Sequence, residues 1–315
     1  MMPQQVRIVE VGPRDGLQNE KRVLPTADKV ALIQRLVAAG LRTVEATAFV
    51  SPKWVPQMAD YDEVLRMTLA QTAADSGASY PVLTPNLRGL EAALAAGATE
   101  VAIFGAASES FSRKNINCSI AESLQRFSAV VQAARQAGVR VRAYVSCVAG
   151  CPYEGPVAPA KVADVVARMR DLGCYEISLG DTIGTGTPRS IDAMLEAVLR
   201  EVPAQQLAGH YHDTFGMAIV NIYASLQRGL AVFDASVGGL GGCPYARGAS
   251  GNVATEDVVW LLQGLGIDCG VNLTQLTDIA LWISSEFGRA PASRVSRALS
   301  ARQCQAVDTA GNECR

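Results

Sequence analysis

One phrase recurs along this chain: a helix-like run ends at a glycine, and a run rich in β-branched residues follows at once. It occurs at LVAAG-LRTVEAT, ALAAG-ATEVAIFG, ARQAG-VRVRAYVSC, MRDLG-CYEISLG and LQRG-LAVFDASV, with the glycines at 40, 97, 138, 173 and 229. Glycine directly after a helix is the usual left-handed C-terminal cap. The runs that follow are short and apolar on both faces, as in strands of a parallel sheet covered by helices on both sides. The repeat therefore predicts alternating helices and parallel strands.

Filling the intervals between these phrases predicts eight strands. They lie at residues 5–11, 42–47, 79–84, 100–105, 140–147, 174–180, 207–212 and 231–236. Eight β/α units in one run of roughly 265 residues are typical of a (β/α)8 TIM barrel. A doubly wound open sheet is the alternative, and it is disfavoured because no Gly-x-Gly-x-x-Gly follows the first strand.

The chain continues beyond the last barrel unit with one more helical pattern, at residues 272–288. Asn272 stands at the cap position before it and Gly288 at the stop position after it. We expect one catalytic domain over residues 1–288 that includes this additional C-terminal helix. Residues 289–315 are polar with scattered arginines, and we expect a partly disordered tail there.

Charge and hydropathy exclude several classes of protein. The net charge is −2, so the chain lacks the basic stripe of a nucleic-acid-binding protein. No run reaches the roughly 18 apolar residues of a membrane span. The eight cysteines are too sparse for a disulfide scaffold and form no Cys-x-x-Cys pair. The first residues enter a strand-like run without a signal-peptide or transit-peptide pattern, so we expect a cytoplasmic protein.

The two histidines of the chain, His210 and His212, stand together at the end of the seventh predicted strand. In a TIM barrel the chemistry lies at the carboxyl ends of the strands. Residues two apart on a strand point to the same face, about 7 Å from each other, so two imidazoles can hold one cation. The alternative is a pair of structural histidines satisfied by hydrogen bonds.

Two further oxygen ligands follow from the closure of a barrel. Asp15 ends the first strand, which neighbours the eighth, and Asn252 follows the eighth strand. Two imidazoles, one carboxylate and one amide oxygen suit Mg²⁺ or Mn²⁺ with open water positions better than a closed zinc site. For Asp15 the alternative is an Asx turn in Arg-Asp-Gly.

Other charged groups lie at strand ends. Arg14 is a fixed cation that would stabilise a developing enolate or carboxylate, or it forms a plain ion pair with Asp15. Asp181 and Glu45 could orient the substrate or a histidine, although an inward Glu45 is as often structural. Lys114 and Asn115 could contact phosphate or pantetheine amide groups, or they belong to a solvated loop.

A glycine-rich segment, 238-GGLGGCPYARGASGN-252, follows the eighth strand and contains Cys243. Its six glycines in 15 residues predict a mobile loop with no core role of its own. A thiol on a loop that can close over a cation site is a candidate acid or base. The alternative is an incidental surface cysteine.

Taken together, these stretches resemble the 3-hydroxy-3-methylglutaryl-CoA lyase family, whose members are metal-dependent TIM-barrel lyases with an Arg-Asp motif after the first strand. The resemblance covers roughly residues 6–300 and includes every strand end. The matching stretches are 9-VEVGPRDGLQNE-20, 49-FVSPKWVPQMAD-60, 105-GAASESFS-112, 114-KNINCSI-120, 145-VSCVAGCPYEG-155, 176-EISLGDTIGTGTP-188, 210-HYHDTFG-216 and 239-GLGGCPYARGASGNVATED-257.

The resemblance implies a retro-Claisen cleavage of an acyl-CoA into acetyl-CoA and acetoacetate by a homodimer, with a divalent cation and no organic cofactor. It implies Asp15, His210, His212 and Asn252 as ligands. Its implied catalytic residues are Arg14 at the thioester oxyanion, His210, alone or assisted by Asp181, as the base, and Cys243 as the proton donor. Gln18 and Glu45 match residues that line the substrate pocket.

One departure concerns substrate choice, because Ala48 stands where the family usually has serine. This leaves open a related lyase for a 3-hydroxyglutaryl-CoA with a bulkier 3-substituent. Two further alternatives are a relative that condenses acetyl-CoA with an oxo acid or acts as an aldolase, and a barrel that only binds or senses acyl-CoA.

Overall fold

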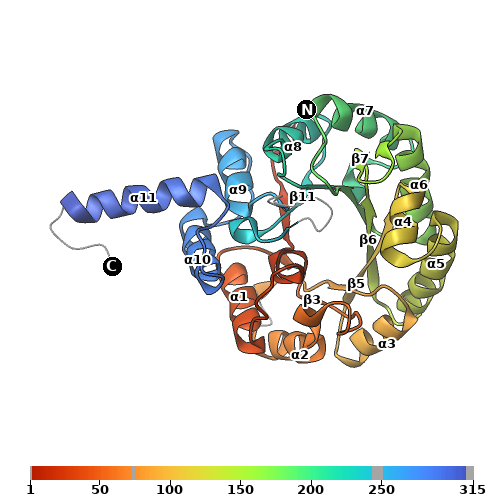
Figure 1. The fold of residues 1–315 in the computed structure, drawn as a ribbon, viewed down its shortest axis with the longest axis horizontal. Helices are drawn as coiled ribbons and strands as arrows, with labels where there is room; N and C mark the ends of the chain where they lie inside the picture. The colour runs from red at the N-terminus through yellow and green to blue at the C-terminus, as the bar shows by residue number, and fades with distance from the viewer. Residues whose placement is uncertain (1, 73–75, 243–250, 310–315) are drawn as a thin grey trace.

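The computed structural model describes residues 2–72, 76–242 and 251–309, with residues 303–309 described by their backbone alone. Its centre is a sheet of nine parallel strands that curls into a barrel (Figure 1). The strand order around the sheet is β2-β1-β11-β10-β9-β6-β5-β4-β3. Their bounds are β1 Arg7–Glu10, β2 Thr43–Val44, β3 Thr47–Ala48, β4 Val82–Leu83, β5 Glu100–Ala106, β6 Arg140–Ser146, β9 Glu176–Asp181, β10 Leu207–Tyr211 and β11 Val232–Ala235.

The barrel closes through a strand that serves both edges of the sheet. β2 pairs with β1 and β3 pairs with β4, and only residues 45 and 46 separate β2 from β3. Between them, the N–H of Glu45 donates to the carbonyl of Glu10 (2.8 Å) and the N–H of Ala46 donates to that of Pro81 (3.0 Å). β2 and β3 are therefore the two parts of the second predicted strand, and the predicted (β/α)8 barrel is confirmed.

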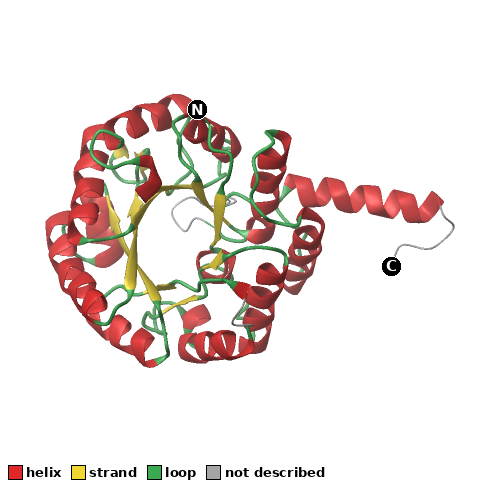
Figure 2. Ribbon diagram, turned by 180° about the vertical axis from the view of Figure 1, so that it is seen from behind, coloured by secondary structure: helices red, strands yellow, loops and turns green. Residues whose placement is uncertain are grey.

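Helices surround the barrel on the outside (Figure 2). The α-helices of the described residues are α1 Thr26–Ala38, α2 Tyr61–Gln71, α3 Leu87–Ala95, α4 Glu109–Ile116, α5 Ile120–Gln136, α6 Pro159–Leu172, α7 Pro188–Val198, α8 Ala218–Gln227, α9 Thr255–Gly264, α10 Leu273–Glu286 and α11 Arg294–Thr309. The glycine caps follow the sequence pattern; Gly173, for example, ends α6 with a φ of 104°. A small hairpin, β7 Gly150–Cys151 with β8 Gly155–Pro156, lies outside the barrel sheet. Within the described residues, no helix combines the length and the apolar character needed to cross a bilayer.

The additional C-terminal helix is confirmed as α10, whose first turn is capped by the side chain of Asn272. Beyond it, where the sequence predicted a partly disordered tail, the chain instead forms the helix α11, which projects away from the barrel (Figure 1). The buried Asp257 of α9 holds the start of α11. Its carboxylate accepts hydrogen bonds from the Ser293 hydroxyl (2.6 Å) and from the N–H of Val295 (3.0 Å).

Two kinds of interior can be distinguished. Apolar side chains fill the space between sheet and helices, as in any parallel barrel. Inside the barrel, however, lies a fully buried arginine, Arg142, which is paired with Glu176 at 2.7 Å and with Asp234 at 2.7 Å. A buried charge is tolerated only when it is paired and hydrogen-bonded, so these three residues depend on one another.

A second buried acidic group holds the turn after β11. The carboxylate of Glu256 accepts the N–H of Gly238 (2.8 Å), and Glu10 accepts the N–H of Val237 (2.9 Å). Burial raises the pKa of Glu256 from 4.5 to about 8, and the neighbouring Glu10 adds to the effect. The folded protein therefore binds this proton more tightly than the unfolded chain does.

From that difference we expect the free energy of unfolding to fall as the pH rises from 4.5 to about 8. The variant Glu256→Gln should not show this fall, because its amide does not ionise. The variant should be more stable than the parent at pH ~9 by roughly 3 to 5 kcal/mol and gain much less at pH ~5. Denaturant unfolding at the two pH values measures this. Glu91→Gln, at an exposed position of α3, is the control. An equal gain at both pH values would show that the effect is not linked to this proton.

Candidate active site

A pocket of about 190 Å³ opens at the carboxyl ends of the barrel strands. The pocket brings together charged, polar and aromatic side chains from most of the β/α units. Its described lining is Arg14, Asp15, Gln18, Asn19, Leu83, Phe104, Phe111, Asn115, Tyr144, Val145, Ser146, Gly180, Thr182, His210, His212 and Gly242. This is the end of the barrel at which the sequence placed the chemistry.

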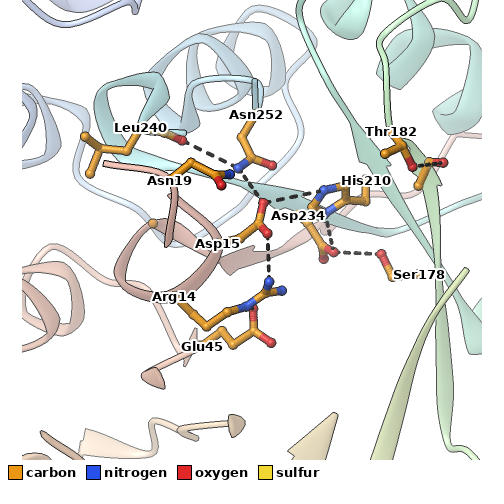
Figure 3. Close-up of polar contacts among 12 residues, drawn as sticks. Arg14, Asp15, Asn19, Glu45, Ser178, Thr182, His210, Asp234, Leu240 and Asn252 are labelled. Carbon is orange, nitrogen blue, oxygen red and sulfur yellow. Dashed lines mark hydrogen bonds and ion pairs between the residues drawn. The ribbon is translucent and has the colours of Figure 1, made fainter. Parts of the chain in front are cut away.

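Three of these residues form a candidate cation site. Asp15 lies in the helical turn Gly12–Gly16 that directly follows the first strand, and His210 and His212 lie at the end of β10. One potential ligand atom from each residue lies within 4.8 Å of those of the other two. The Nε2 atom of His210 is 4.0 Å from Oδ2 of Asp15 (Figure 3). Tyr211, between the histidines, points the other way and bonds the Ser225 hydroxyl of α8 at 2.8 Å.

The fourth predicted ligand, Asn252, lies beside this cluster. Its Nδ2 donates to Oδ2 of Asp15 at 2.8 Å, and the residue pairs with His212 through an isolated antiparallel bridge. In this arrangement the amide nitrogen faces Asp15. The nitrogen and oxygen of an amide are interchangeable by a half-turn of the group, which would bring the oxygen toward the cluster.

The electrostatics of the cluster favour ligand-competent protonation states of Asp15 and His212. For His210, burial lowers the pKa, but the Asp234 and Asp15 carboxylates outweigh it and raise that pKa. Burial opposes the charge on Asp15, but the attraction of Arg14 and the two histidines outweighs it and lowers the Asp15 pKa to about 2. Burial and the neighbouring His210 lower the pKa of His212 to about 4. Near neutral pH, Asp15 is therefore an anion and His212 a neutral imidazole, and these are the forms that bind a cation.

Arg14 is fixed beside the cluster by two carboxylates. Its Nε donates to Oε2 of Glu45 and one terminal nitrogen donates to Oδ1 of Asp15, both at 2.7 Å. Its guanidinium lies 5.3 Å from the ring centre of Tyr144. Burial disfavours the charge on Arg14, but Glu45 and Asp15 overcome this and raise its pKa. Arg14 is therefore a permanent, oriented cation at the pocket wall.

The remaining predicted site residues divide into three groups. Gln18 and Asn115 line the pocket, and their contacts with substrate stay a prediction. Glu45 is fully buried behind Arg14, and Lys114 is exposed, with its ammonium 3.8 Å from the ring centre of Tyr153. Cys243 lies outside the described residues, so its place in the site stays a prediction.

Asp181 occupies a different position from the pocket residues. Gly180 and Thr182 line the pocket, whereas the carboxylate of Asp181 accepts the N–H of Gly186 at 2.8 Å. Strand alternation turns Asp181 away from the face that its two neighbours share. Burial raises its pKa to about 6. In the structure it holds the loop after β9, and its catalytic role stays a prediction.

The sequence interpretation missed three residues beside the site: Tyr144, Arg142 and Asp234. Tyr144 meets the His210 ring edge-on at 5.9 Å between ring centres. Asp234 of β11 lies behind the same ring, 3.1 Å from its Nδ1. A signal was present, because Arg142 and Asp234 are charged residues in the middle of mainly apolar strand segments, 141-VRAYV-145 and 230-LAVFDA-235.

An Asp15–His210–His212 donor set with Asn252 beside it fits a divalent cation such as Mg²⁺ or Mn²⁺. The fold and the site thus define a (β/α)8-barrel enzyme with donors for a divalent cation at the carboxyl ends of its strands. The family model described as HMGL-like matches residues 5–283. The chain belongs to the HMGL-like family.

Individual relatives cover nearly the whole chain. This chain is 61% identical over 296 residues to the mitochondrial hydroxymethylglutaryl-CoA lyase of Bos taurus. The match covers 94% of this chain and 90% of that protein. The corresponding protein of Gallus gallus is also 61% identical, over 94% of this chain and 98% of its own length. The solved structure of hydroxymethylglutaryl-CoA lyase from Pseudomonas aeruginosa is 56% identical. It has a TM-score of 0.92 and covers 96% of this chain and 99% of that one.

These relatives overturn the expected cytoplasmic location. The proteins of Bos taurus and Gallus gallus are named as mitochondrial enzymes, as is that of Arabidopsis thaliana at 60% identity. The prediction was wrong because it used the absence of a targeting pattern as a positive sign.

Proposed function

We propose that this enzyme cleaves 3-hydroxy-3-methylglutaryl-CoA into acetyl-CoA and acetoacetate. The observation that carries the proposal is the meeting of Asp15, His210 and His212 with the fixed cation Arg14 at one pocket. The substrate class follows from the relatives, which are named hydroxymethylglutaryl-CoA lyases. The pocket is large enough for the acyl group but not for the coenzyme A arm, which would extend outside it toward Asn115 and Lys114 of α4.

In this reaction the proton of the C3 hydroxyl leaves to a base and the C2–C3 bond breaks. Its electron pair passes to the thioester as the enolate of acetyl-CoA, and C3 becomes the ketone of acetoacetate. Asp15, His210 and His212, with the Asn252 oxygen after a half-turn of its amide, would hold the cation. A divalent cation bound there would polarise the hydroxyl and make it more acidic.

Arg14 acts on the other half of the reaction. Its guanidinium is oriented by Glu45 and Asp15 before substrate binds, so it can stabilise the thioester oxyanion without reorganising. Gln18 lines the same pocket and would contact the acyl group. Cys243 would return a proton to the enolate carbon. For His210 two roles compete, ligand and proton acceptor, and Asp181 would assist only the second.

The test is acetoacetate release from 3-hydroxy-3-methylglutaryl-CoA, measured with Mg²⁺, with Mn²⁺ and after chelation. We expect product only with a divalent cation. The same assay with longer 3-alkyl substrates tests the alternative of a lyase for a bulkier 3-substituent. Ala48 favours that alternative, because it is fully buried and is paired in register with the pocket residue Leu83. Absence of acetoacetate, together with condensation of acetyl-CoA with an oxo acid, would replace the proposal by the condensing alternative.

Cys243→Ser tests the assigned proton donor. The hydroxyl of serine is a much weaker acid than a thiol, so we expect kcat to fall by about 10²-fold or more with little change in KM. Steady-state kinetics of acetoacetate release provide the measurement. The matched control is Cys174→Ser, which changes a buried cysteine two residues before β9. Turnover of Cys243→Ser equal to that of the parent would remove the thiol from the mechanism.

A homodimer remains part of the proposal, as the family resemblance implies. The outward course of α11 would suit a contact between two copies of the chain.

A further inference from the structure

We propose that Asp234 is a positioning residue for His210, and that together with Arg142 it commits His210 to holding the cation and excludes it as the proton acceptor. The inference rests on the cation-dependent cleavage proposed above and deepens it. It decides between the two roles that compete for this one ring.

Asp234 is anchored more firmly than an ordinary buried carboxylate. Two nitrogens of Arg142 donate to its two oxygens, at 2.7 Å to Oδ1 and 3.2 Å to Oδ2. The Ser178 hydroxyl also donates to Oδ2, at 2.7 Å (Figure 3). Arg142 is itself held by Glu176 at 2.7 Å. These residues come from β6, β9 and β11, so three strands fix the position of one carboxylate.

This anchoring determines the tautomer of His210. Among the described residues, every other group that contacts the Asp234 carboxylate is a donor. Two of these donations come from a permanent cation, which keeps the carboxylate ionised and therefore acceptor-only. Nδ1 of His210, 3.1 Å from Oδ2 of Asp234, must then be the donor in their hydrogen bond. A neutral imidazole has one N–H and one lone pair, so the lone pair of His210 lies on Nε2.

The position of Nε2 directs its lone pair at the candidate cation site. Nε2 faces Asp15 across 4.0 Å, within the cluster that also includes His212. Tyr144 packs edge-on against the ring, with its centre 5.9 Å from that of His210, and hinders rotation of the ring away from the cluster. A lone pair that binds a cation cannot also take the hydroxyl proton. The proton acceptor is therefore another group.

The test reads the tautomer directly, because the chain has only two histidines. Protein labelled with ¹⁵N-histidine and loaded with Mg²⁺ gives one pair of ring nitrogens per residue in long-range ¹H–¹⁵N spectra, and His212→Gln assigns them. We expect His210 to be protonated on Nδ1. In the variant Asp234→Asn, the asparagine amide can donate to Nδ1, so we expect the Nδ1-protonated tautomer of His210 to be lost. Mn²⁺ binding, followed by electron paramagnetic resonance, should weaken about 10–100-fold.

Glu100→Gln is the matched control. It also removes a buried carboxylate paired with an arginine, Arg140, but at the start of β5, at the opposite end of the barrel. It is expected to leave both the His210 tautomer and Mn²⁺ affinity unchanged.

Two results would overturn the inference: a parent protein with His210 protonated on Nε2, or Asp234→Asn with unchanged tautomer and Mn²⁺ affinity. If Asp234→Asn does not fold, the spectrum of the parent protein decides alone. Neither readout uses substrate, so the two proposals can fail separately. Failure of the acetoacetate assay would remove the cleavage and leave the tautomer and cation affinity of His210 as measured, whereas an Nε2-protonated His210 would overturn this inference and leave the cleavage.

Discussion

Replacing Arg14 by glutamine is expected to lower kcat by about 10²–10³-fold, the loss typical when a preorganised donor to an oxyanion is removed. Arg14 is the charged group that Glu45 and Asp15 orient at the pocket wall, and both ion pairs are 2.7 Å long. Glutamine can still donate a hydrogen bond but has no charge to balance the enolate. Because the enolate forms only as the bond breaks, kcat should fall much more than substrate affinity.

Arg14→Lys separates charge from geometry in this prediction. Lysine keeps the charge but lacks the planar guanidinium group that contacts two carboxylates. We therefore expect the activity of Arg14→Lys to lie between that of Arg14→Gln and that of the parent enzyme. The measurements are steady-state kinetics of acetoacetate release and Mn²⁺ titration of each variant. A kcat for Arg14→Gln within a fewfold of the parent, at saturating cation, would show that Arg14 does not stabilise the transition state.

The second large effect is expected for Asp15→Asn, which keeps the shape of the side chain and removes the only carboxylate among the three donors of the cluster. Loss of a residue that supports a ligand typically weakens metal binding 10–100-fold, so loss of a charged ligand should weaken Mn²⁺ binding by at least ~100-fold. The Asp15 pKa is lowered to about 2, so the parent carboxylate is ionised near neutral pH, whereas the amide of asparagine cannot ionise. Raising the pH should therefore not relieve the defect.

Asp213→Asn is the matched control, since Asp213 is a carboxylate at the same strand end that instead accepts the N–H of Ala218 at 3.0 Å. Its Mn²⁺ affinity should remain close to that of the parent. Isothermal calorimetry or Mn²⁺ resonance titration measures both variants. Equal affinities for Asp15→Asn and the parent would show that the cation, if bound, lies elsewhere.

Most of the architecture was predictable because its signals are local. A glycine that ends a helix acts through its own φ, as at Gly173, and the strand after it is recognised by its apolar run. The facing of His210 and His212 was also predictable, and Tyr211 points to α8 as alternation requires. The same alternation, applied to Gly180 and Thr182, would have turned Asp181 away from the pocket.

Other features could not be read from local patterns. α11 begins where Ser293 and Val295 meet Asp257, a contact between segments far apart in sequence. Glu45 holds Arg14 rather than lining the pocket, because its place behind Arg14 depends on how the first two strands pack. The role of Asp234 likewise needs the neighbouring strand β10 to be in place.

The sequence by itself determined the order of helices and strands and which side chains share a face, because both are properties of the backbone over a few residues. Only the tertiary structure decided that the side chains of Asp15 and His210 lie 4.0 Å apart. It also decided that Arg142 anchors the Asp234 carboxylate behind the His210 ring. Those distances are set when the barrel closes and the ends of distant strands meet. The energy of that closure comes from packing across the whole sheet, and no short stretch of the chain contains it.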